Sequence, residues 1–402
     1  MQNLKIFTTN IEQEAMNQIN TLLEQPAFQD CKVRIMPDVH AGKGCVIGFT
    51  ANLGDKVIPN IVGVDIGCGM LVVELGREDI NFNRVDEIIR QHVPSGRNVH
   101  TERFKRFEGL QDLRCYRELK DTKRLKRSLG TLGGGNHFIE IDVDDDGTKY
   151  LVIHTGSRNL GKQVAEYYQK LAVELMSGKD KLFEAQNKLI AEYKQQGRKK
   201  EIKAAITELH RNFQSNKLNT PKELCYLTGQ HRDDYLHDMR ICQYFASMNR
   251  YEIASRIVGD LFGADIAYWG LNMFETIHNY IEFETNIVRK GAISAKKGEK
   301  LLIPINMRDG CIIGIGKGND DWNCSAPHGA GRIMSRSKAK QQIILEEYAK
   351  SMEGIFTTCV NNDTIDESPM AYKPMDEILE NITDSVEVLK IIRPVYNFKA
   401  SE

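Results

Sequence analysis

The sequence has no apolar run long enough to cross a membrane, and it has almost no excess charge of either sign. Its 54 Lys and Arg residues balance 55 Asp and Glu, which leaves a formal net charge of −1 over 402 residues. Such a chain has no global attraction to nucleic acid, so any RNA contact must come from a local basic surface. The first residues also lack the charged and apolar regions of a signal peptide. We therefore expect a cytoplasmic protein without a membrane segment.

Internal repeats, low-complexity tracts and Pro/Ser-rich linkers are also missing, so we expect one domain over residues 1–402. With 41% hydrophobic and 27% charged residues, the chain can bury a large core. The nine cysteines are odd in number and have no repeating spacing, which argues against a disulfide framework. We expect most of them to be free, buried thiols.

Apolar spacing predicts an opening helix over residues 11–25 and helices throughout a long insertion at residues 162–262. Short apolar runs broken by glycine between residues 33 and 73, such as 46–49 and 61–64, predict strands and tight turns. Further strands are predicted at residues 138–143, 150–153, 301–305 and 311–315. The helical insertion thus separates two β-rich halves.

Asp, Cys and His residues in glycine- or Asn-flanked motifs are the first candidates for chemistry, because these side chains coordinate transition-type metals. They are Asp65, Cys68, His137, His154 and His278. Asp65-Ile66-Gly67-Cys68 can bring a carboxylate and a thiol together on one turn. Taken alone, that motif also fits an N-capping Asp beside a buried Cys, and a single His is more often structural than a ligand. The combined set favours a metal centre.

A different motif surrounds His328, which is followed by Gly329, Ala330, Gly331 and Arg332. Small residues here expose backbone N–H groups that suit a bound phosphate, and the Arg332 guanidinium suits a second one. From the residues alone, His328 is a ligand, a general base or a nucleophile. The run Gly314-x-Gly316-x-Gly318 has no convincing helix start after it, so we do not predict a dinucleotide fold or a P-loop.

Several of these stretches strongly resemble the RtcB family of RNA ligases, and the resemblance spans nearly the whole chain in order. They are 36–40 (MPDVH), 62–70 (VGVDIGCGM), 132–140 (LGGGNHFIE), 153–158 (IHTGSR), 289–292 (RKGA), 328–336 (HGAGRIMSR) and 369–373 (PMAYK).

The resemblance implies a single α+β domain with central mixed β-sheets and the helical insertion outside. It also implies a GTP- and Mn²⁺-dependent ligase that joins an RNA 3′-phosphate or 2′,3′-cyclic phosphate to a 5′-hydroxyl, in RNA repair or tRNA splicing. His328 would become guanylylated, and the nucleotide would then pass to the RNA 3′-phosphate. It leaves open whether an activating protein is a further partner.

By the same matching, Cys68 would bridge two manganese ions that Asp65, His137, His154 and His278 complete. Arg158, Lys290 and Arg332 would hold RNA phosphates. The residues matching the family's GTP site are Asn136, His137, Phe138, Ile139, Glu140, His278, Asn279, Pro304, Ile305, Asn306, Met307, Cys311, His328, Gly329, Ala330, Gly331 and Lys399.

The chain departs from the family pattern at Asn306 and at Cys311, where a Ser is common, and both changes bear on guanine preference. The helical stretch 179–217 is longer than usual and carries Arg198-Lys199-Lys200, which is a hypothetical RNA or partner surface. Interleaved acidic residues there favour a solvated helix instead. The alternative function is a metal-dependent phosphatase or nuclease acting on RNA ends. Such an enzyme would turn over without GTP and would not need a histidine in a Gly-Ala-Gly loop.

Overall fold

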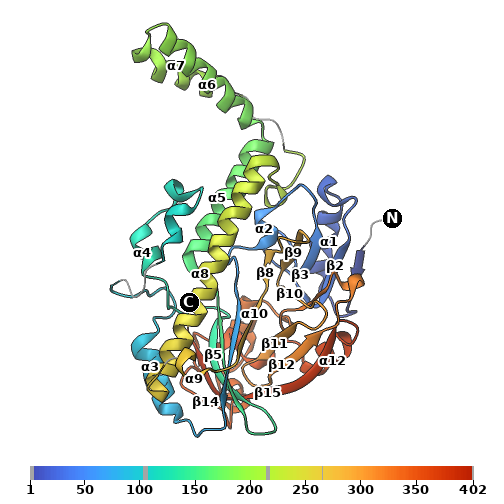
Figure 1. The fold of residues 1–402 in the computed structure, drawn as a ribbon. Coiled ribbons are helices and arrows are strands. Elements are labelled where there is room, and N and C mark those ends of the chain that lie inside the picture. The colour runs from blue at the N-terminus through green and yellow to red at the C-terminus, as the bar shows by residue number, and fades with distance from the viewer. Residues whose placement is uncertain (1–3, 103–106, 214–217, 265, 401–402) are drawn as a thin grey trace.

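A strongly curved sheet of eight strands forms the centre of the fold in this computed structural model, which describes residues 4–102, 107–213, 218–264 and 266–400 (Figure 1). The strands run in the order β11-β12-β15-β5-β6-β4-β7, and β14 pairs with β15. Leu302 on β11 donates its backbone N–H to Thr276 Oγ1 on β7 at 3.2 Å, so the two ends of the sheet approach each other. The strand bounds are β4 Gly69–Gly76, β5 Phe138–Val143, β6 Lys149–Thr155, β7 Met273–Ile277, β11 Lys300–Asn306, β12 Gly310–Gly316, β14 Phe356–Thr357 and β15 Val386–Lys399.

A second sheet of five strands lies beside the first, in the order β1-β2-β3-β9-β8, and β10 and β13 form a two-stranded ribbon. The pair β1/β2 is parallel, whereas the remaining pairs of this sheet are antiparallel. The bounds are β1 Leu4–Ile6, β2 Val33–His40, β3 Ile47–Asn52, β8 Asn279–Ile281, β9 Ile287–Lys290, β10 Ala292–Ser294 and β13 Ser325–Pro327. Mixed sheets with separate helices confirm the predicted α+β class.

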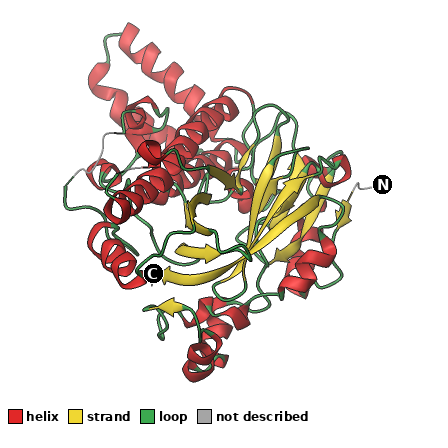
Figure 2. Ribbon diagram, turned by 60° about the horizontal axis from the view of Figure 1, so that its bottom comes forward, coloured by secondary structure: helices red, strands yellow, loops and turns green. Residues whose placement is uncertain are grey.

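Helices cover the outside of the sheets (Figure 2). The longest, α8 (Gly229–Phe262), runs along the body beside α5 (Arg158–Met176), while α6 (Lys179–Gln195) and α7 (Ile202–Asn212) form an arm that projects away from it (Figure 1). The other α-helices are α1 Gln13–Leu23, α2 Pro59–Val62, α3 Phe82–His92, α4 Thr122–Lys126, α9 Ile266–Trp269, α10 Arg336–Gln342, α11 Leu345–Ser351 and α12 Met375–Asn381. Within the described residues, no helix has the length and apolar character needed to span a membrane.

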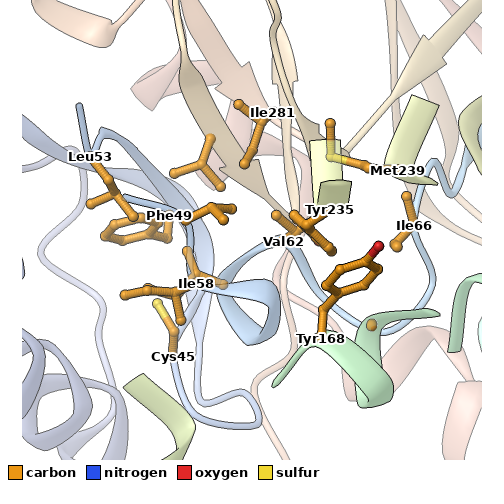
Figure 3. Packing of buried hydrophobic residues seen from close by; sticks show 14 of the residues in the cluster. Cys45, Phe49, Leu53, Ile58, Val62, Ile66, Tyr168, Tyr235, Met239 and Ile281 are labelled. Atoms are coloured by element: carbon orange, nitrogen blue, oxygen red, sulfur yellow. The ribbon is translucent and has the colours of Figure 1, made fainter. Parts of the chain in front are cut away.

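The largest core cluster packs the five-stranded sheet against α5 and α8 (Figure 3). Tyr168 on α5 and Tyr235 on α8 meet edge to face, with ring centroids 5.3 Å apart. The Tyr168 hydroxyl donates to the fully buried Asp238 carboxylate at 2.8 Å, which satisfies a polar atom inside this core. The same cluster includes Ile66, which precedes Cys68 by two residues, so the first candidate motif is anchored on a packed surface.

The predicted strands at residues 138–143, 150–153, 301–305 and 311–315 are all confirmed, as are the opening helix and the helices between β6 and β7. The strand predicted at residues 61–64 is wrong, because residues 59–62 form α2. Pro59 occupies the first turn of this helix, where its missing N–H is not needed, and Ile61 and Val62 are buried in the core as helix residues. All nine cysteines are free thiols, and seven of them are buried.

Candidate active site

Three of the predicted metal ligands converge at one end of the curved sheet. Cys68 lies at the start of β4, His154 lies on the adjacent β6, and His137 immediately precedes β5. The Cys68 Sγ atom is 3.5 Å from His137 Nε2 and 3.3 Å from His154 Nε2. All three side chains are buried, and their ligand atoms lie within 4.8 Å of one another. This spacing suits coordination of one ion by a thiolate and two imidazoles.

Backbone carbonyls fix the orientation of both imidazoles. His137 Nδ1 lies 2.9 Å from the Leu132 carbonyl oxygen, and His154 Nδ1 lies 3.0 Å from the Asn136 carbonyl oxygen. A carbonyl can only accept, so each Nδ1 donates its proton there, and each Nε2 faces Cys68. This arrangement is typical of metal-ligating histidines, whose second nitrogen is held by a backbone or carboxylate oxygen.

Asp65 and His278 extend the cluster in two directions. The Asp65 Oδ2 atom lies 3.1 Å from His137 Nε2. On the other side, the His278 ring centroid is 5.2 Å from that of His154 and 4.7 Å from that of His328. His278 is buried, and its Nδ1 has no hydrogen-bond partner in the described part of the chain. The five predicted ligands therefore form one continuous group that ends beside His328.

Burial controls the protonation of these groups. It raises the pKa of the Cys68 thiol well above its usual value, and the Asp65 carboxylate adds to this effect. It also lowers the pKa values of His154 and His278 well below the usual value, with neighbouring histidines contributing. Both imidazoles are thus neutral and ready to coordinate, whereas a thiolate at Cys68 requires a nearby cation. The donor set fits a transition-type metal ion.

Residues 65–68, here called the metal loop, carry Asp65 and Cys68. Glycines in and beside this loop allow its backbone to pass close to its neighbours. Gly67 has φ +70°, and a Cβ there would lie 2.9 Å from Gln243 Cα on α8. At Gly156, a Cβ would lie 2.4 Å from Asp65 Oδ1 and would displace that carboxylate. Larger residues at either position would therefore separate Asp65 or Cys68 from the other ligands.

Arg250 on α8 ties the two ligand-bearing segments together. Its Nη1 donates to the carbonyl oxygens of Gly67 at 2.9 Å and of Thr155 at 2.8 Å, next to Cys68 and His154 respectively. The guanidinium also pairs with Glu275 through Nε at 3.0 Å. Arg250 is fully buried, so the helical insertion directly holds the metal loop in place.

His328 is oriented by a buried carboxylate from the other sheet. Asp38 on β2 places Oδ2 2.6 Å from His328 Nδ1 and also accepts the His328 backbone N–H at 3.1 Å. Since the carboxylate accepts from Nδ1–H, the Nε2 lone pair of His328 is free to attack an electrophile. Gly331, at φ +77°, lets the following backbone pass Asp38, because a Cβ there would lie 2.3 Å from the Asp38 carbonyl oxygen.

A cavity of about 480 Å³ opens beside His328 and His154. It is large enough for a small-molecule ligand. Of the predicted site residues, those lining it are Asn136, Phe138, Glu140, His154, Pro304, Ile305, Asn306, Met307, His328, Gly329, Ala330, Gly331, Arg332 and Lys399. Its other lining residues include Glu12, His40, Arg336, Glu367 and Tyr372.

A buried ion-pair network forms part of the cavity wall. Glu367 accepts from the Lys399 amine at 2.9 Å, from Arg332 at 3.4 Å and from the Tyr372 hydroxyl at 2.7 Å. Burial opposes ionisation of Glu367, but the charges of Lys399, Arg336 and Arg332 lower its pKa to about 2. At neutral pH the cations on this wall are therefore held in place by an ionised carboxylate.

Two residues that were expected in the nucleotide site, Ile139 and Cys311, do not line the cavity. Ile139 points to the opposite face of β5 from Phe138 and Glu140 and packs in another core cluster, as strand alternation requires. Cys311 is buried beneath the cavity and not on its wall. His137, His278 and Asn279 adjoin the cavity only through the metal cluster, and the Asn279 side chain donates to the Asp65 carbonyl oxygen at 3.2 Å.

The three expected RNA contacts differ in position. Arg332 lines the cavity. Lys290 is buried and donates to the carbonyl oxygens of Lys43 at 2.8 Å and Asn60 at 3.0 Å, which is a structural role in this state. Arg158 donates to Thr131 Oγ1 at 3.2 Å and to the Gly96 carbonyl oxygen at 3.1 Å, close to the Asp65 side of the metal group.

Sequence reasoning missed Asp38, Arg250 and Glu367 as site residues. Asp38 belongs to a quoted motif, MPDVH, but nothing in that motif says which distant histidine it contacts. Arg250 lies within a polar helical stretch, and Glu367 has no distinctive local pattern. The roles of Asp38, Arg250 and Glu367 depend on contacts across 290, 183 and 32 positions of sequence, respectively.

Comparison with known proteins agrees with this arrangement. The family described as "tRNA-splicing ligase RtcB" matches residues 18–119 and 109–400. The RNA-splicing ligase RtcB of Escherichia coli K12 is 31% identical over 435 aligned positions, covering 98% of this chain and 96% of the relative. The tRNA-splicing ligase RtcB of Aeropyrum pernix is 27% identical and covers 91% of this chain and 88% of its own length. An RNA-splicing ligase RtcB of Mycobacterium bovis is 26% identical, with coverages of 90% and 94%.

Proposed function

The chain belongs to the RtcB family of RNA ligases, and we propose that it joins RNA ends using GTP and Mn²⁺ through a guanylylated His328. The observation that carries the proposal is the placement of His328 between the metal group and the 480 Å³ cavity, with Asp38 holding its Nδ1. Its substrates are an RNA with a 3′-phosphate or 2′,3′-cyclic phosphate and an RNA with a 5′-hydroxyl. A cytoplasmic role in RNA repair or tRNA processing is part of the same proposal.

In the first step, His328 Nε2 attacks the α-phosphorus of GTP, a P–N bond forms, and the bond to pyrophosphate breaks. The imidazole gains positive charge as it attacks, and the Asp38 carboxylate at Nδ1 stabilises that charge. Gly329, Ala330 and Gly331 keep the space beside the ring free of bulky side chains. This is covalent catalysis, which divides one difficult transfer into easier ones.

In the later steps, an oxygen of the RNA 3′-phosphate takes the GMP group from His328, and the P–N bond breaks. The 5′-hydroxyl then attacks the activated phosphate and releases GMP. A cyclic phosphate would first be opened by hydrolysis. Arg332 lies on the cavity wall where it can pair with these phosphates, and Arg158 and Lys290 are the weaker candidates because backbone carbonyls already occupy them.

The residues that would hold the manganese ions are Asp65, Cys68, His137, His154 and His278. When bound, the ions would neutralise phosphate charge during in-line displacement. The chain's own part is to orient the imidazoles of His137 and His154 through the Leu132 and Asn136 carbonyls. Thiolate and imidazole ligands bind Zn²⁺ more tightly than Mn²⁺, so excess zinc should inhibit.

We propose that Glu140 and Lys399, which both line the cavity, bind the guanine base. The Glu140 carboxylate accepts a hydrogen bond from Asn397 Nδ2, which fixes its orientation. A carboxylate held this way can accept the adjacent N–H groups of guanine but has nothing to donate to adenine's ring nitrogen. Asn306 is held on the wall, because its Nδ2 donates to Asp309 at 2.8 Å and its Oδ1 accepts the backbone N–H groups of Arg308 and Asp309.

The test is to incubate the protein with MnCl₂ and GTP labelled at the α-phosphate, beside a His328→Ala variant, and to measure label on the denatured chain. Acid-labile, base-stable label on the unmodified protein alone would support a phosphoramidate at His328. Label with ATP but not GTP would overturn the guanine assignment. No label with either nucleotide, together with release of phosphate from RNA ends, would favour the metal-dependent phosphatase or nuclease.

A further inference from the structure

A second group of ligand-type side chains lies inside the curved sheet, beneath the cavity floor. Glu140 and Asp142 project inward from β5, and Cys311 projects inward from β12. Their exposed fractions are 2%, 0% and 0%, and their ligand atoms lie within 4.8 Å of one another. Neither Asp142 nor Cys311 lines the cavity, so this group is distinct from the metal group at Cys68.

The unusual feature of this group is its unpartnered oxygen atoms. Neither carboxylate oxygen of Asp142 has a hydrogen-bond partner among the described residues, although the Cys311 thiol lies beside it. Asn397, which donates Nδ2 to Glu140, leaves its own Oδ1 without a partner. An isolated buried carboxylate costs several kcal/mol or more, so proteins rarely retain one without a compensating charge or proton.

The surroundings supply no such charge to Asp142. Cys311 packs in a cluster with Val72, Val152, Leu302 and Ile392, which are all apolar. Burial and the Glu140 carboxylate raise the pKa of Asp142 well above its usual value. The Lys399 charge acts on Glu140 instead. Both Asp142 oxygens and the Cys311 sulfur are thus buried, and no cation pairs with them among the described residues.

We propose that Asp142, Cys311 and Glu140 form a second buried metal site that takes one divalent ion of the zinc class. One thiolate and several oxygen donors make a mixed soft and hard set, which suits Zn²⁺ or Co²⁺ better than Mg²⁺ or Ca²⁺. A tetrahedral Zn²⁺ site spaces its ligand atoms by roughly 3.3–3.8 Å, and the ligand atoms of the present group lie within 4.8 Å of one another.

Charge balance supports the same assignment. The Asp142 carboxylate and the Cys311 thiolate together carry two negative charges, which one divalent ion neutralises. Burial raises the pKa of Glu140 to about 7 against the Asn397 hydrogen bond and the Lys399 charge, and the residue also lines the cavity. The ion would therefore lie directly under the carboxylate proposed to read the nucleotide base, and it would brace β5 against β12.

The experiment uses Co²⁺, because thiolate ligation to Co²⁺ gives a charge-transfer absorption band. In a Cys68→Ala variant the first site has lost its thiol, so any remaining band must come from another cysteine. We expect a band with one equivalent of Co²⁺, and its loss in Cys68→Ala/Cys311→Ser and weakening in Cys68→Ala/Asp142→Asn. The matched control is Cys68→Ala/Cys45→Ala, which removes a different fully buried thiol and should keep the band.

No band in Cys68→Ala, or a band that Cys311→Ser leaves unchanged, would overturn the proposal and favour a protonated Asp142. If the variants fail to fold, anomalous scattering from the Co²⁺-loaded unmodified protein decides instead. A peak between β5 and β12, separate from the one at Cys68, is expected, and its absence would contradict the site. Labelling of His328 by GTP is independent of either result, so failure here would not affect the proposed ligase activity.

Discussion

Replacing Asp38 by Asn should slow the transfer of GMP to His328 while leaving the fold intact. The Asp38 Oδ2 atom lies 2.6 Å from His328 Nδ1 and 3.1 Å from its backbone nitrogen. An asparagine of the same shape can keep one neutral hydrogen bond, but it loses the charge that stabilises the imidazolium formed during attack. Its amide can also present a donor to Nδ1 and thereby favour the wrong tautomer.

The size of the effect follows from the strength of the lost interaction. Hydrogen bonds to charged groups contribute about 1.5–3 kcal/mol, and each 1.36 kcal/mol changes a rate tenfold. We therefore expect Asp38→Asn to reduce the rate of adduct formation by about 10- to 150-fold. GTP affinity should change little, because Asp38 contacts His328, the proposed nucleophile, and does not line the cavity.

The assay is a single-turnover measurement of labelled GMP on the denatured protein, across a series of GTP concentrations. The matched control is Asp86→Asn, which removes a buried carboxylate that accepts from Arg90 and Tyr396 far from His328. Circular dichroism would check that both variants fold. An unchanged rate in Asp38→Asn, or a loss equal to that of Asp86→Asn, would refute the orienting role.

Three further predictions follow from other contacts. Arg250→Met should weaken metal affinity by about 10- to 100-fold in a chelator competition, because it releases the carbonyls of Gly67 and Thr155. The control Arg256→Met breaks an ion pair with Asp260 on the same helix and should leave metal affinity unchanged. Glu367 has a folded pKa of about 2 against an ordinary 4.5, so its contribution to stability is present above pH 4.5 and is lost as pH falls toward 2. The free energy of unfolding in urea at neutral pH should therefore be about 3 kcal/mol lower for Glu367→Gln than for the unmodified protein. If acid lowers the stability of both proteins equally, the prediction is contradicted. Replacing residues 179–212 by a short Gly/Ser linker should leave GMP labelling of His328 unchanged, because α7 has no buried residue and the arm projects away from the body (Figure 1); a large loss of labelling would show that the arm supports the site.

The sequence predicted local structure and residue chemistry well, because both depend on short patterns. Strand β5 was predicted with its observed bounds, since its apolar alternation lies between clear turn residues. The candidate metal ligands could be chosen because Asp, Cys and His in glycine-rich motifs are rare enough to stand out. The chosen residues Asp65, Cys68, His137 and His154 do lie together in the structure.

Contacts between distant segments could not be predicted in the same way. Residues 61–64 have the composition of a strand, and only Pro59 and the packing of Ile61 against the core make them part of a helix and turn. Cys311 was assigned to the nucleotide from its place in a motif, yet strand pairing directs its side chain into the sheet interior beside Asp142. Because alternate residues of a strand point to opposite faces, a shift of one residue moves a side chain from the cavity wall to the core. Which face is buried depends on tertiary packing.

The position of β15 has a consequence for how the protein is made. This strand supplies Lys399, yet it lies in the middle of the eight-stranded sheet, between β12 and β5. A chain still emerging from the ribosome can form the metal loops and the His328 loop, but the sheet stays open until residues 386–399 are released and insert. Ligation capacity should therefore arise only after synthesis has passed this strand, and the partly made chain would expose two unpaired strand edges that chaperones can recognise.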